Sequence, residues 1–231
     1  MTETLVLVPG LNCTARLFEP QVAALRAGRE ILIADHARDD TMAAIARRLL
    51  HRAPERFALA GLSMGGYIAL EVMHQAPERV ARLALLDTNA RADTDEQRLS
   101  REREIALAEG DRFAQVCEAR WARSVLPERR SDPELRQVYD LMAAETGPEV
   151  FARQLRAIMG RRDSRPTLPA IRVPTLIVVG DADELTPPEQ AREMAGLIPA
   201  AALVVVPRCG HLSTLERPQA VNAALATWVG G

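Results

Sequence analysis

The sequence predicts an α/β fold in which helices flank a six-stranded, mainly parallel sheet. Two patterns lead to this prediction. Short apolar runs are continuous rather than alternating, which is typical of parallel strands that are buried on both faces. Segments of helical length, with apolar residues three and four positions apart, separate most of these runs. The strand runs are Leu5–Val8, Ile31–Ala34, Phe57–Ala60, Leu83–Leu86, Thr175–Val179 and Leu203–Val206.

The intervening segments predict the helices, and right-handed crossovers should connect the strands. Outside one long stretch, the helical segments are Phe18–Ala27, Met42–Arg52, Gly65–Gln75 and Pro188–Leu197. The alternation stops between Asp87 and Val173, where the chain is rich in Arg and Glu and shows no convincing strand. The candidate helices there are Glu102–Ala108, Phe113–Val125, Glu134–Ala144 and Val150–Met159. We therefore expect a core of residues 1–87 and 173–231 and a helical insertion, residues 88–172, between the fourth and fifth strands.

Composition excludes several classes of function. The chain has 231 residues and a formal net charge of −2, and its positive charges are all arginine. A near-neutral balance argues against a nucleic-acid partner, since phosphate binding needs surplus positive charge. Without lysine there is no Schiff-base lysine and no P-loop lysine. Three scattered cysteines without a Cys-x-x-Cys pair do not suggest a disulfide framework or a zinc site.

The sequence also carries expectations about location and ligands. Its first residues include an acid and no basic segment, and no apolar run approaches the roughly 18 residues of a membrane span. We therefore expect a cytoplasmic protein without a membrane partner. His36 and its neighbouring aspartates form the densest His/Asp group, which we interpret as a polar loop. We expect a small-molecule substrate, no cofactor and no metal, and the sequence does not indicate an oligomeric state.

A nucleophile motif follows the third strand run. The segment Gly61–Gly66 reads GLSMGG and stands directly between Phe57–Ala60 and a helical segment. The pattern G-x-S-x-G in this setting places the serine on a tight turn whose neighbours must lack a bulky side chain. The hydroxyl of Ser63 would then project at the carboxyl edge of the sheet, beside the amides that begin the next helix. The alternative is a glycine-rich turn without chemistry.

A serine needs a base, and the chain has four histidines. His211 follows the last strand run in a loop at the same sheet edge as Ser63, so we choose it as the base. His36, after the second strand run, is the weaker alternative. His51 and His74 lie near the ends of helical segments, and we expect them at the surface.

The base needs an acid to orient it. Asp181, Asp183 and Glu184 all follow the fifth strand run, before His211. We favour Asp183 and interpret the other two as capping residues. Asp87, at the end of the fourth strand run, is an outside candidate. The resulting chain order of Ser, Asp and His is that of one hydrolase architecture and differs from the serine-protease orders.

An oxyanion site requires backbone N–H groups beside the serine. The amide of Met64 directly follows Ser63, and we expect the second donor in the loop after the first strand run. There Gly10 permits a close approach of the backbone, so we propose the N–H of Leu11. Asn12 either adds a side-chain amide or holds the loop.

These residues together resemble the α/β-hydrolase superfamily, and within it the small lid-bearing esterases, enol-lactonases and carbon–carbon bond hydrolases. The resemblance covers essentially the whole chain through the motifs LVLVPG, GLSMGG, APERVARLALLD, VVGDADELTPP and PRCGHLSTLERP. It implies the α/β-hydrolase fold with strand order 2-1-3-4-5-6 and a lid over residues 88–172. It further implies Ser63 as nucleophile, Asp183 as acid, His211 as base, and the amides of Leu11 and Met64 as oxyanion donors.

The sequence departs from the family pattern in three places. Pro9 replaces the histidine that usually follows the first strand, the usual first two strands do not precede Leu5, and the loop after the second strand run is shortened. None of these changes removes a triad residue.

The resemblance implies a serine hydrolase that acts on a small carboxylic ester, thioester or lactone. Alternatives are carbon–carbon bond hydrolysis of a dienoic ketone, a cofactor-free haloperoxidase or perhydrolase, and a non-catalytic ligand-binding protein. The Arg pairs 129–130 and 161–162 could attract an acidic substrate, but we expect a solvated surface there.

Overall fold

A computed structural model describes residues 3–199 and 201–230 of the chain. Six strands form one sheet in the order β2-β1-β3-β4-β5-β6, and each neighbouring pair is parallel. The predicted fold class and strand order are therefore confirmed. The strands are β1 (Leu5–Val8), β2 (Ile31–Ile33), β3 (Phe57–Leu62), β4 (Val80–Leu86), β5 (Thr175–Gly180) and β6 (Ala202–Val206).

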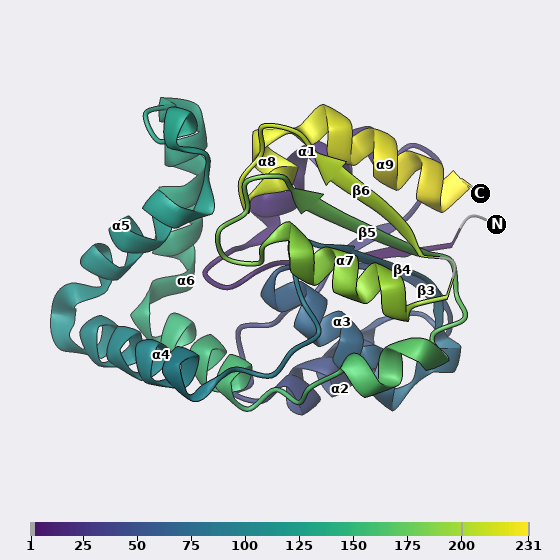
Figure 1. The fold of residues 1–231 in the computed structure, drawn as a ribbon, viewed down its shortest axis with the longest axis horizontal. Coiled ribbons are helices and arrows are strands. Elements are labelled where there is room, and N and C mark those ends of the chain that lie inside the picture. Colours follow the sequence, from purple (N-terminus) through teal and green to yellow (C-terminus); the bar gives the residue numbers. More distant parts are fainter. Residues whose placement is uncertain (1–2, 200, 231) are drawn as a thin grey trace.

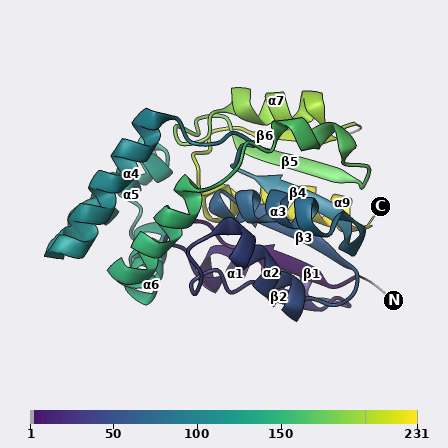
Figure 2. The ribbon, with the colours of Figure 1, turned by 90° about the horizontal axis from the view of Figure 1, so that it is seen from below.

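Helices cover both faces of the sheet (Figures 1 and 2). One face packs against α2 (Met42–Arg52), α3 (Met64–Gln75) and α7 (Pro188–Leu197). The other face packs against α1 (Glu19–Leu25) and α9 (Pro218–Gly230), with the short helix α8 (Ser213–Glu216) beside them. Short 3₁₀ segments lie at η1 (Ala15–Phe18), η2 (Pro77–Arg79), η4 (Pro127–Arg129) and η5 (Arg165–Ala170).

The two-sided burial explains why the strand runs are apolar throughout. In β1, the side chains of Leu5 and Leu7 join one core, while Val6 and Val8 join the other. Successive residues of a strand point to opposite faces, so both sets need apolar side chains. Full burial of one such side chain contributes about 1.5–3 kcal/mol.

The chain between β4 and β5 is helical, and most of it lies beyond the carboxyl ends of the strands (Figure 1). It contains α4 (Asp95–Leu107), the π-helical turn η3 (Ala108–Arg112), α5 (Phe113–Ser124) and α6 (Pro133–Met159). We call α4, α5 and α6 the inserted helices.

Helix α6 unites two segments that the sequence predicted as separate helices, Glu134–Ala144 and Val150–Met159. A kink at Gly147, where φ is +71°, divides its two arms. Glycine adopts this left-handed conformation without steric cost, so the chain turns there and resumes the helix.

Aromatic side chains join the inserted helices to one another. The ring centroids of Phe113 and Phe151 are 5.4 Å apart, and those of Trp121 and Tyr139 are 5.2 Å apart. Both pairs join α5 to α6 and fix the packing of these two helices. Among the described residues, no helix combines the length and apolar character needed to cross a membrane.

Candidate active site

Ser63 occupies a strained turn between β3 and α3. Its backbone has φ 56° and ψ −115°, which non-glycine residues rarely adopt. The surrounding chain leaves no room for side chains at the motif glycines. A Cβ on Gly61 would lie 2.1 Å from the carbonyl oxygen of Gly65, and one on Gly65 would lie 2.0 Å from that of Val8. The glycine pattern of the motif is therefore a steric requirement of this turn.

Two hydrogen bonds tie the turn to the end of β4 and the residues that follow it. The N–H of Ser63 donates to the carbonyl of Leu86 at 2.9 Å. The hydroxyl of Thr88 donates to the carbonyl of Ser63 at 2.8 Å. Strained backbone persists only where its surroundings hold it, and these bonds provide that support.

The structure brings Ser63, His211 and Asp183 into one hydrogen-bonded chain at the carboxyl edge of the sheet. The Nε2 atom of His211 is 2.9 Å from the Oγ of Ser63. The Nδ1 atom of His211 is 2.8 Å from Oδ2 of Asp183. Ser63 follows β3, Asp183 follows β5 and His211 follows β6, so parallel strands deliver all three side chains to one edge.

The carboxylate of Asp183 is satisfied on both oxygens. Oδ1 accepts the N–H groups of Leu185 at 2.8 Å and Thr186 at 2.9 Å. Oδ2 accepts the hydroxyl of Thr186 at 2.7 Å as well as the ring of His211. Burial alone would raise the pKa of Asp183, but the charge and hydrogen bond of His211 and the bonds from Thr186 outweigh it and lower the pKa. Asp183 is therefore held as a carboxylate.

His211 shows the matching effect. Burial disfavours its charged form, but the Asp183 carboxylate and the hydrogen bond to it outweigh burial and raise the pKa of His211 above its ordinary value. The pair is thus arranged to stabilise an imidazolium. A histidine that takes a proton from a serine hydroxyl needs this stabilisation.

The loop that carries His211 is fastened to the chain between β4 and β5. The N–H groups of His211 and Leu212 both donate to the carbonyl of Ser124, each at 3.1 Å. The buried carboxylate of Glu216 accepts the N–H of Gly210 at 2.9 Å and that of Leu126 at 3.0 Å. The position of His211 therefore depends on the end of α5.

The loop after β1 lies against the serine turn. A Cβ on Gly10 would be 3.4 Å from the Cβ of Ser63. Within the described part of the chain, no protein acceptor takes the amide hydrogen of Leu11 or of Met64. Both amides adjoin the serine, the first on this loop and the second at the start of α3.

The other sequence candidates have different partners. His36 is buried, and its Nε2 donates to the carbonyl of Gly10 at 2.9 Å, so it supports the loop of Leu11 rather than contacting Ser63. Burial lowers the pKa of His36, which keeps the ring neutral. Asp181 accepts the N–H of Cys209 at 3.1 Å, so it joins its turn to the loop before His211 rather than capping a helix.

Asp87 is fully buried beneath the site. It accepts the N–H of Gly180 at 3.0 Å and the hydroxyl of Ser213. Burial first, and then the charge of Asp183, raise the pKa of Asp87 to about 8. Asp87 makes no hydrogen bond to His211 among the described contacts, so its visible role is to join β4, β5 and α8.

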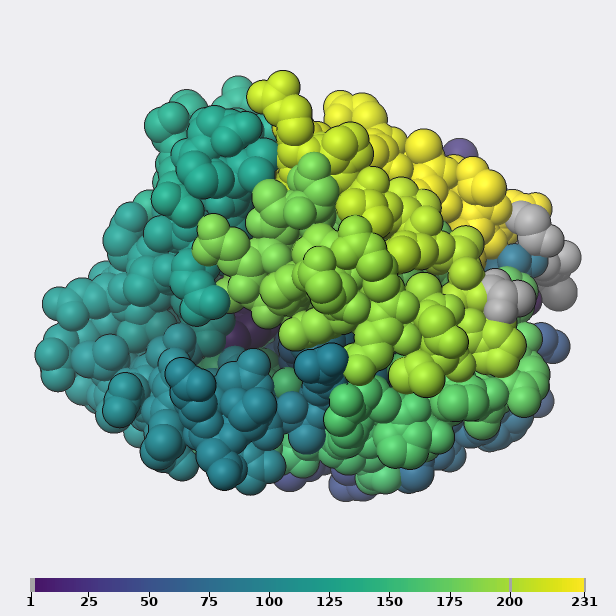
Figure 3. Space-filling view, in the orientation of Figure 1, coloured from purple at the N-terminus to yellow at the C-terminus, as the bar shows by residue number. Residues whose placement is uncertain are grey.

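A cavity of about 90 Å³ opens onto Ser63 and His211, which is room for several water molecules. The loop after β1 forms one wall, and the inserted helices contribute Arg101, Arg120 and Tyr139. A second hollow of about 190 Å³ adjoins it and shares Arg101, Arg120 and Leu185. Figure 3 shows a hollow between the teal inserted helices and the green segment around α7, with purple N-terminal residues at its floor.

Sequence reasoning missed several residues of this site. The spacing Asp-x-x-Thr from Asp183 to Thr186 is a capping pattern that could have identified Thr186. No sequence signal marks Glu216, Arg101 or Arg120. Among the described lining residues, neither Arg pair that the sequence singled out borders the cavity: Arg161 binds Asp93, the partner of Arg101, and Arg129 binds Asp132.

Metal binding has no support in the geometry. Within residues 3–199 and 201–230, no group of three or more His, Cys, Asp or Glu side chains is placed to hold a metal ion.

Comparison with known proteins places the chain in a family. The family model described as "Alpha/beta hydrolase family" matches residues 5–224. The chain belongs to the α/β-hydrolase family. The predicted resemblance is thereby confirmed, and the protein is a hydrolase-family enzyme.

Relatives within this family differ in the activities that their names state. A Mycobacterium tuberculosis protein named as a candidate non-heme bromoperoxidase is 30% identical over 195 residues, covering 80% of this chain and 71% of its own. A pimeloyl-[acyl-carrier protein] methyl ester esterase from Aromatoleum aromaticum is 28% identical over 195 residues, covering 79% and 78%. A thermophilic esterase from Thermogutta terrifontis superposes with a TM-score of 0.89 at 29% identity, covering 99% and 91%.

Proposed function

We propose that this α/β-hydrolase is a serine hydrolase that cleaves a small carboxylic ester, thioester or lactone through an acyl-enzyme. The observation that carries the proposal is the hydrogen-bonded chain from Ser63 through His211 to Asp183, with distances of 2.9 and 2.8 Å. The first distance suits proton transfer from Ser63 to His211, and the second suits the hydrogen bond by which Asp183 orients the ring. The strained turn, which exposes Ser63 beside two amides without protein acceptors, supports the same role.

The residues divide the reaction between them. The Oγ of Ser63 attacks the substrate carbonyl while Nε2 of His211 takes the hydroxyl proton. The amides of Leu11 and Met64 donate to the oxyanion of the tetrahedral intermediate. As the intermediate collapses, His211 returns the proton to the leaving alcohol or thiol. Water, deprotonated by His211, then attacks the acyl-enzyme and releases the acid and free Ser63.

We propose a small acyl group because the cavity beside Ser63 measures about 90 Å³. The inserted helices, with residues 88–172, would act as a lid that shapes this cavity and excludes water. Two esterases among the relatives are consistent with ester cleavage, although their particular substrates are properties of those proteins.

An ester panel tests the proposal. We expect steady turnover of 4-nitrophenyl acetate and butyrate, with a burst of nitrophenol when deacylation is slow. A ring-cleavage dienoate is expected to be a poor substrate. If the protein turns over neither ester but cleaves the dienoate, carbon–carbon chemistry replaces our proposal. If it binds esters without turnover, the chain is a binding protein.

A halide-oxidising reaction is a second candidate, favoured by the name of the mycobacterial relative. In such a reaction hydrogen peroxide would replace water as the acceptor of the acyl group at Ser63 and leave as a peracid. The peracid would then oxidise bromide to hypobromite and become the carboxylic acid. Adding hydrogen peroxide and bromide to the ester assay tests it: bromination that depends on Ser63 supports this activity, and unchanged hydrolysis without bromination contradicts it.

The pH dependence of ester hydrolysis should follow His211. The base works only when its ring is neutral, and Asp183 raises the pKa of His211 above 6.5. We therefore expect kcat/KM to fall as pH is lowered through this raised value, so that the acid limb lies at higher pH than for an unperturbed histidine. Initial rates with 4-nitrophenyl acetate between about pH 5 and about pH 9 measure it. An acid limb below pH 6.5 would contradict the account.

A further inference from the structure

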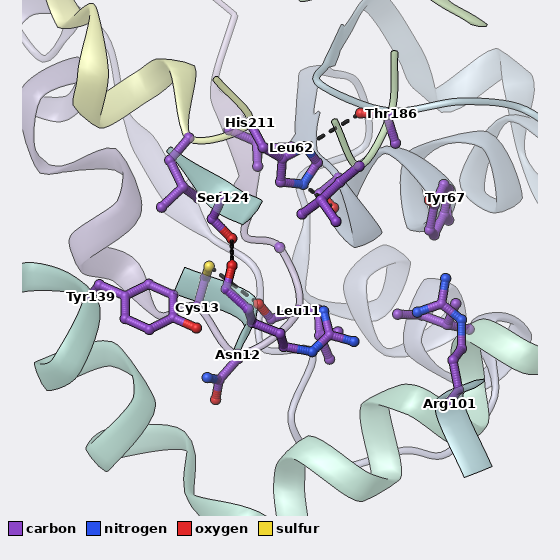
Figure 4. Close-up of a pocket in the computed structure, with 16 residues that line it drawn as sticks. Leu11, Asn12, Cys13, Leu62, Tyr67, Arg101, Ser124, Tyr139, Thr186 and His211 are labelled. Atoms are coloured by element: carbon purple, nitrogen blue, oxygen red, sulfur yellow. Dashed lines mark hydrogen bonds between the residues drawn. The ribbon is translucent and has the colours of Figure 1, made fainter. Parts of the chain in front are cut away.

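Two arginines of the inserted helices, Arg101 and Arg120, line the same cavity as Ser63 and His211. Arg101 comes from α4 and Arg120 from α5. Their side chains are 18% and 17% exposed, so both are largely withdrawn from solvent. In Figure 4, Arg101 and Tyr139 lie on opposite sides of the cavity. No aspartate or glutamate is among the residues that line it.

In each arginine, the Nε and Nη2 atoms of the guanidinium bind a carboxylate. Arg101 donates from Nε at 2.7 Å and from Nη2 at 3.2 Å to the buried carboxylate of Asp93. Arg120 donates from Nε at 3.1 Å and from Nη2 to Glu104, and its guanidinium lies 5.2 Å from the ring centroid of Phe151. The hydrogen bonds of the described residues include none from Nη1 of either arginine. Both groups are thus fixed in place with donors to spare.

The charges of this cluster do not cancel. Asp93 also binds Arg161, at 2.6 Å, so Asp93 and Glu104 face three guanidinium groups. These five groups together carry a net charge of +1. In a largely buried setting, an unmatched charge attracts an anion more strongly than it would in water.

The second hollow indicates the direction in which a bound substrate would extend. Arg101 and Arg120 line both the Ser63 cavity and the outer hollow, so they stand between the two. A substrate whose carbonyl lies at Ser63 would extend its far end toward them.

We propose that Arg101 and Arg120 form an anion subsite for a carboxylate of the substrate. The preferred substrates are then short esters, thioesters or lactones that carry a free carboxylate a few bonds from the scissile carbonyl. A carboxylate fits better than a phosphate dianion because one carboxylate matches the single excess positive charge of the cluster. This inference rests on the proposed hydrolase function, whose substrate class it narrows.

Matched methyl esters test the subsite. Monomethyl glutarate carries the carboxylate, and dimethyl glutarate has the same acyl chain with that charge capped. For the wild-type protein we expect kcat/KM, measured by methanol release, to be at least about 10-fold higher for the monoester. Arg101→Gln and Arg120→Gln should each lower it roughly 10- to 100-fold for the monoester and less than about 3-fold for the diester.

Control variants distinguish a loss of anion binding from a loss of folding. Arg103→Gln removes the same charge from an exposed position on the same helix as Arg101 and should change both rates by less than about 3-fold. Compared with Arg120→Gln, Arg120→Lys should recover part of the monoester preference, because lysine restores the positive charge but not the paired N–H donors of a guanidinium. If Arg120→Gln lowers the melting temperature, Arg101→Gln still tests the anion subsite. In that variant Asp93 keeps Arg161 as its partner, so no buried carboxylate loses all its ion pairs.

Calorimetry on Ser63→Ala gives a reading without turnover. Monomethyl glutarate should bind this variant at least about 10-fold more tightly than it binds Ser63→Ala combined with Arg120→Gln. Equal binding, equal rates for the two wild-type esters, equal losses for both esters in the arginine variants, or tighter binding of inorganic phosphate would each overturn the subsite. If the protein cleaves no ester at all, the hydrolase proposal fails, and the calorimetric comparison still tests the anion site.

Discussion

Replacement of Ser63 by alanine is expected to lower kcat for 4-nitrophenyl butyrate by about 10⁵- to 10⁶-fold. The substitution removes the hydroxyl that Nε2 of His211 contacts at 2.9 Å, so no acyl-enzyme can form. The remaining rate would come from the oxyanion donors and from substrate binding alone. Stopped assays with long incubation measure the residual turnover, and the melting temperature should stay within about 2 °C of the wild type.

The matched control is Ser131→Ala, at an exposed serine that does not line the cavity. It should leave turnover within about 2-fold of the wild type. Adding His211→Gln to Ser63→Ala should cause no further loss of turnover, because the two residues act as one unit. A Ser63→Ala variant that retains more than about a tenth of the activity would show that another group is the nucleophile.

Replacement of Asp183 by asparagine is expected to lower kcat by about 10⁴-fold. Asp183 holds Nδ1 of His211 at 2.8 Å, and an amide in its place would favour the wrong tautomer. The loss of the carboxylate should also move the acid limb of the kcat/KM profile to lower pH, because Asp183 is what raises the pKa of His211. Full pH profiles of the variant and the wild type measure both effects.

Glu184→Gln is the matched control for the acid. Glu184 adjoins Asp183 in the same turn, is exposed and was a rival acid in the sequence. We expect its loss to change kcat by less than about 2-fold and to leave the pH profile in place. If Glu184→Gln and Asp183→Asn had equal effects, the assignment of the acid would be wrong. Asp87→Asn tests Asp87, a further candidate for the acid. Asp87 bonds Gly180 and Ser213 rather than His211.

Local patterns were enough to predict the fold. Each strand run is apolar throughout because both faces of the sheet are covered, as β1 shows, and that pattern can be seen in the sequence. The glycines around Ser63 are required by backbone contacts of 2.0–2.1 Å, so the motif carries its own steric reason. The kink at Gly147 was missed because helical spacing on its two sides predicts two helices equally well.

Proximity of Ser63, Asp183 and His211 could be inferred because parallel strands end at one edge. Side chains that arrive from helices could not be inferred in this way. Arg101 and Arg120 reach the cavity only through the tertiary packing of α4 and α5. For α5, the contact between Phe113 and Phe151 of α6 is part of that packing. The role of Glu216 could not be predicted for the same reason, because its partner Leu126 is 90 positions away in the sequence.

The central claim is that Ser63 is an activated nucleophile. Incubation with a fluorophosphonate, followed by intact-mass measurement and peptide mapping, tests it most directly, because the reagent labels a serine only when a base has activated it. We expect a single adduct on the wild-type protein, mapped to Ser63, with slower labelling of His211→Gln and none of Ser63→Ala. An unlabelled wild type, or equal labelling of Ser63→Ala, would contradict it.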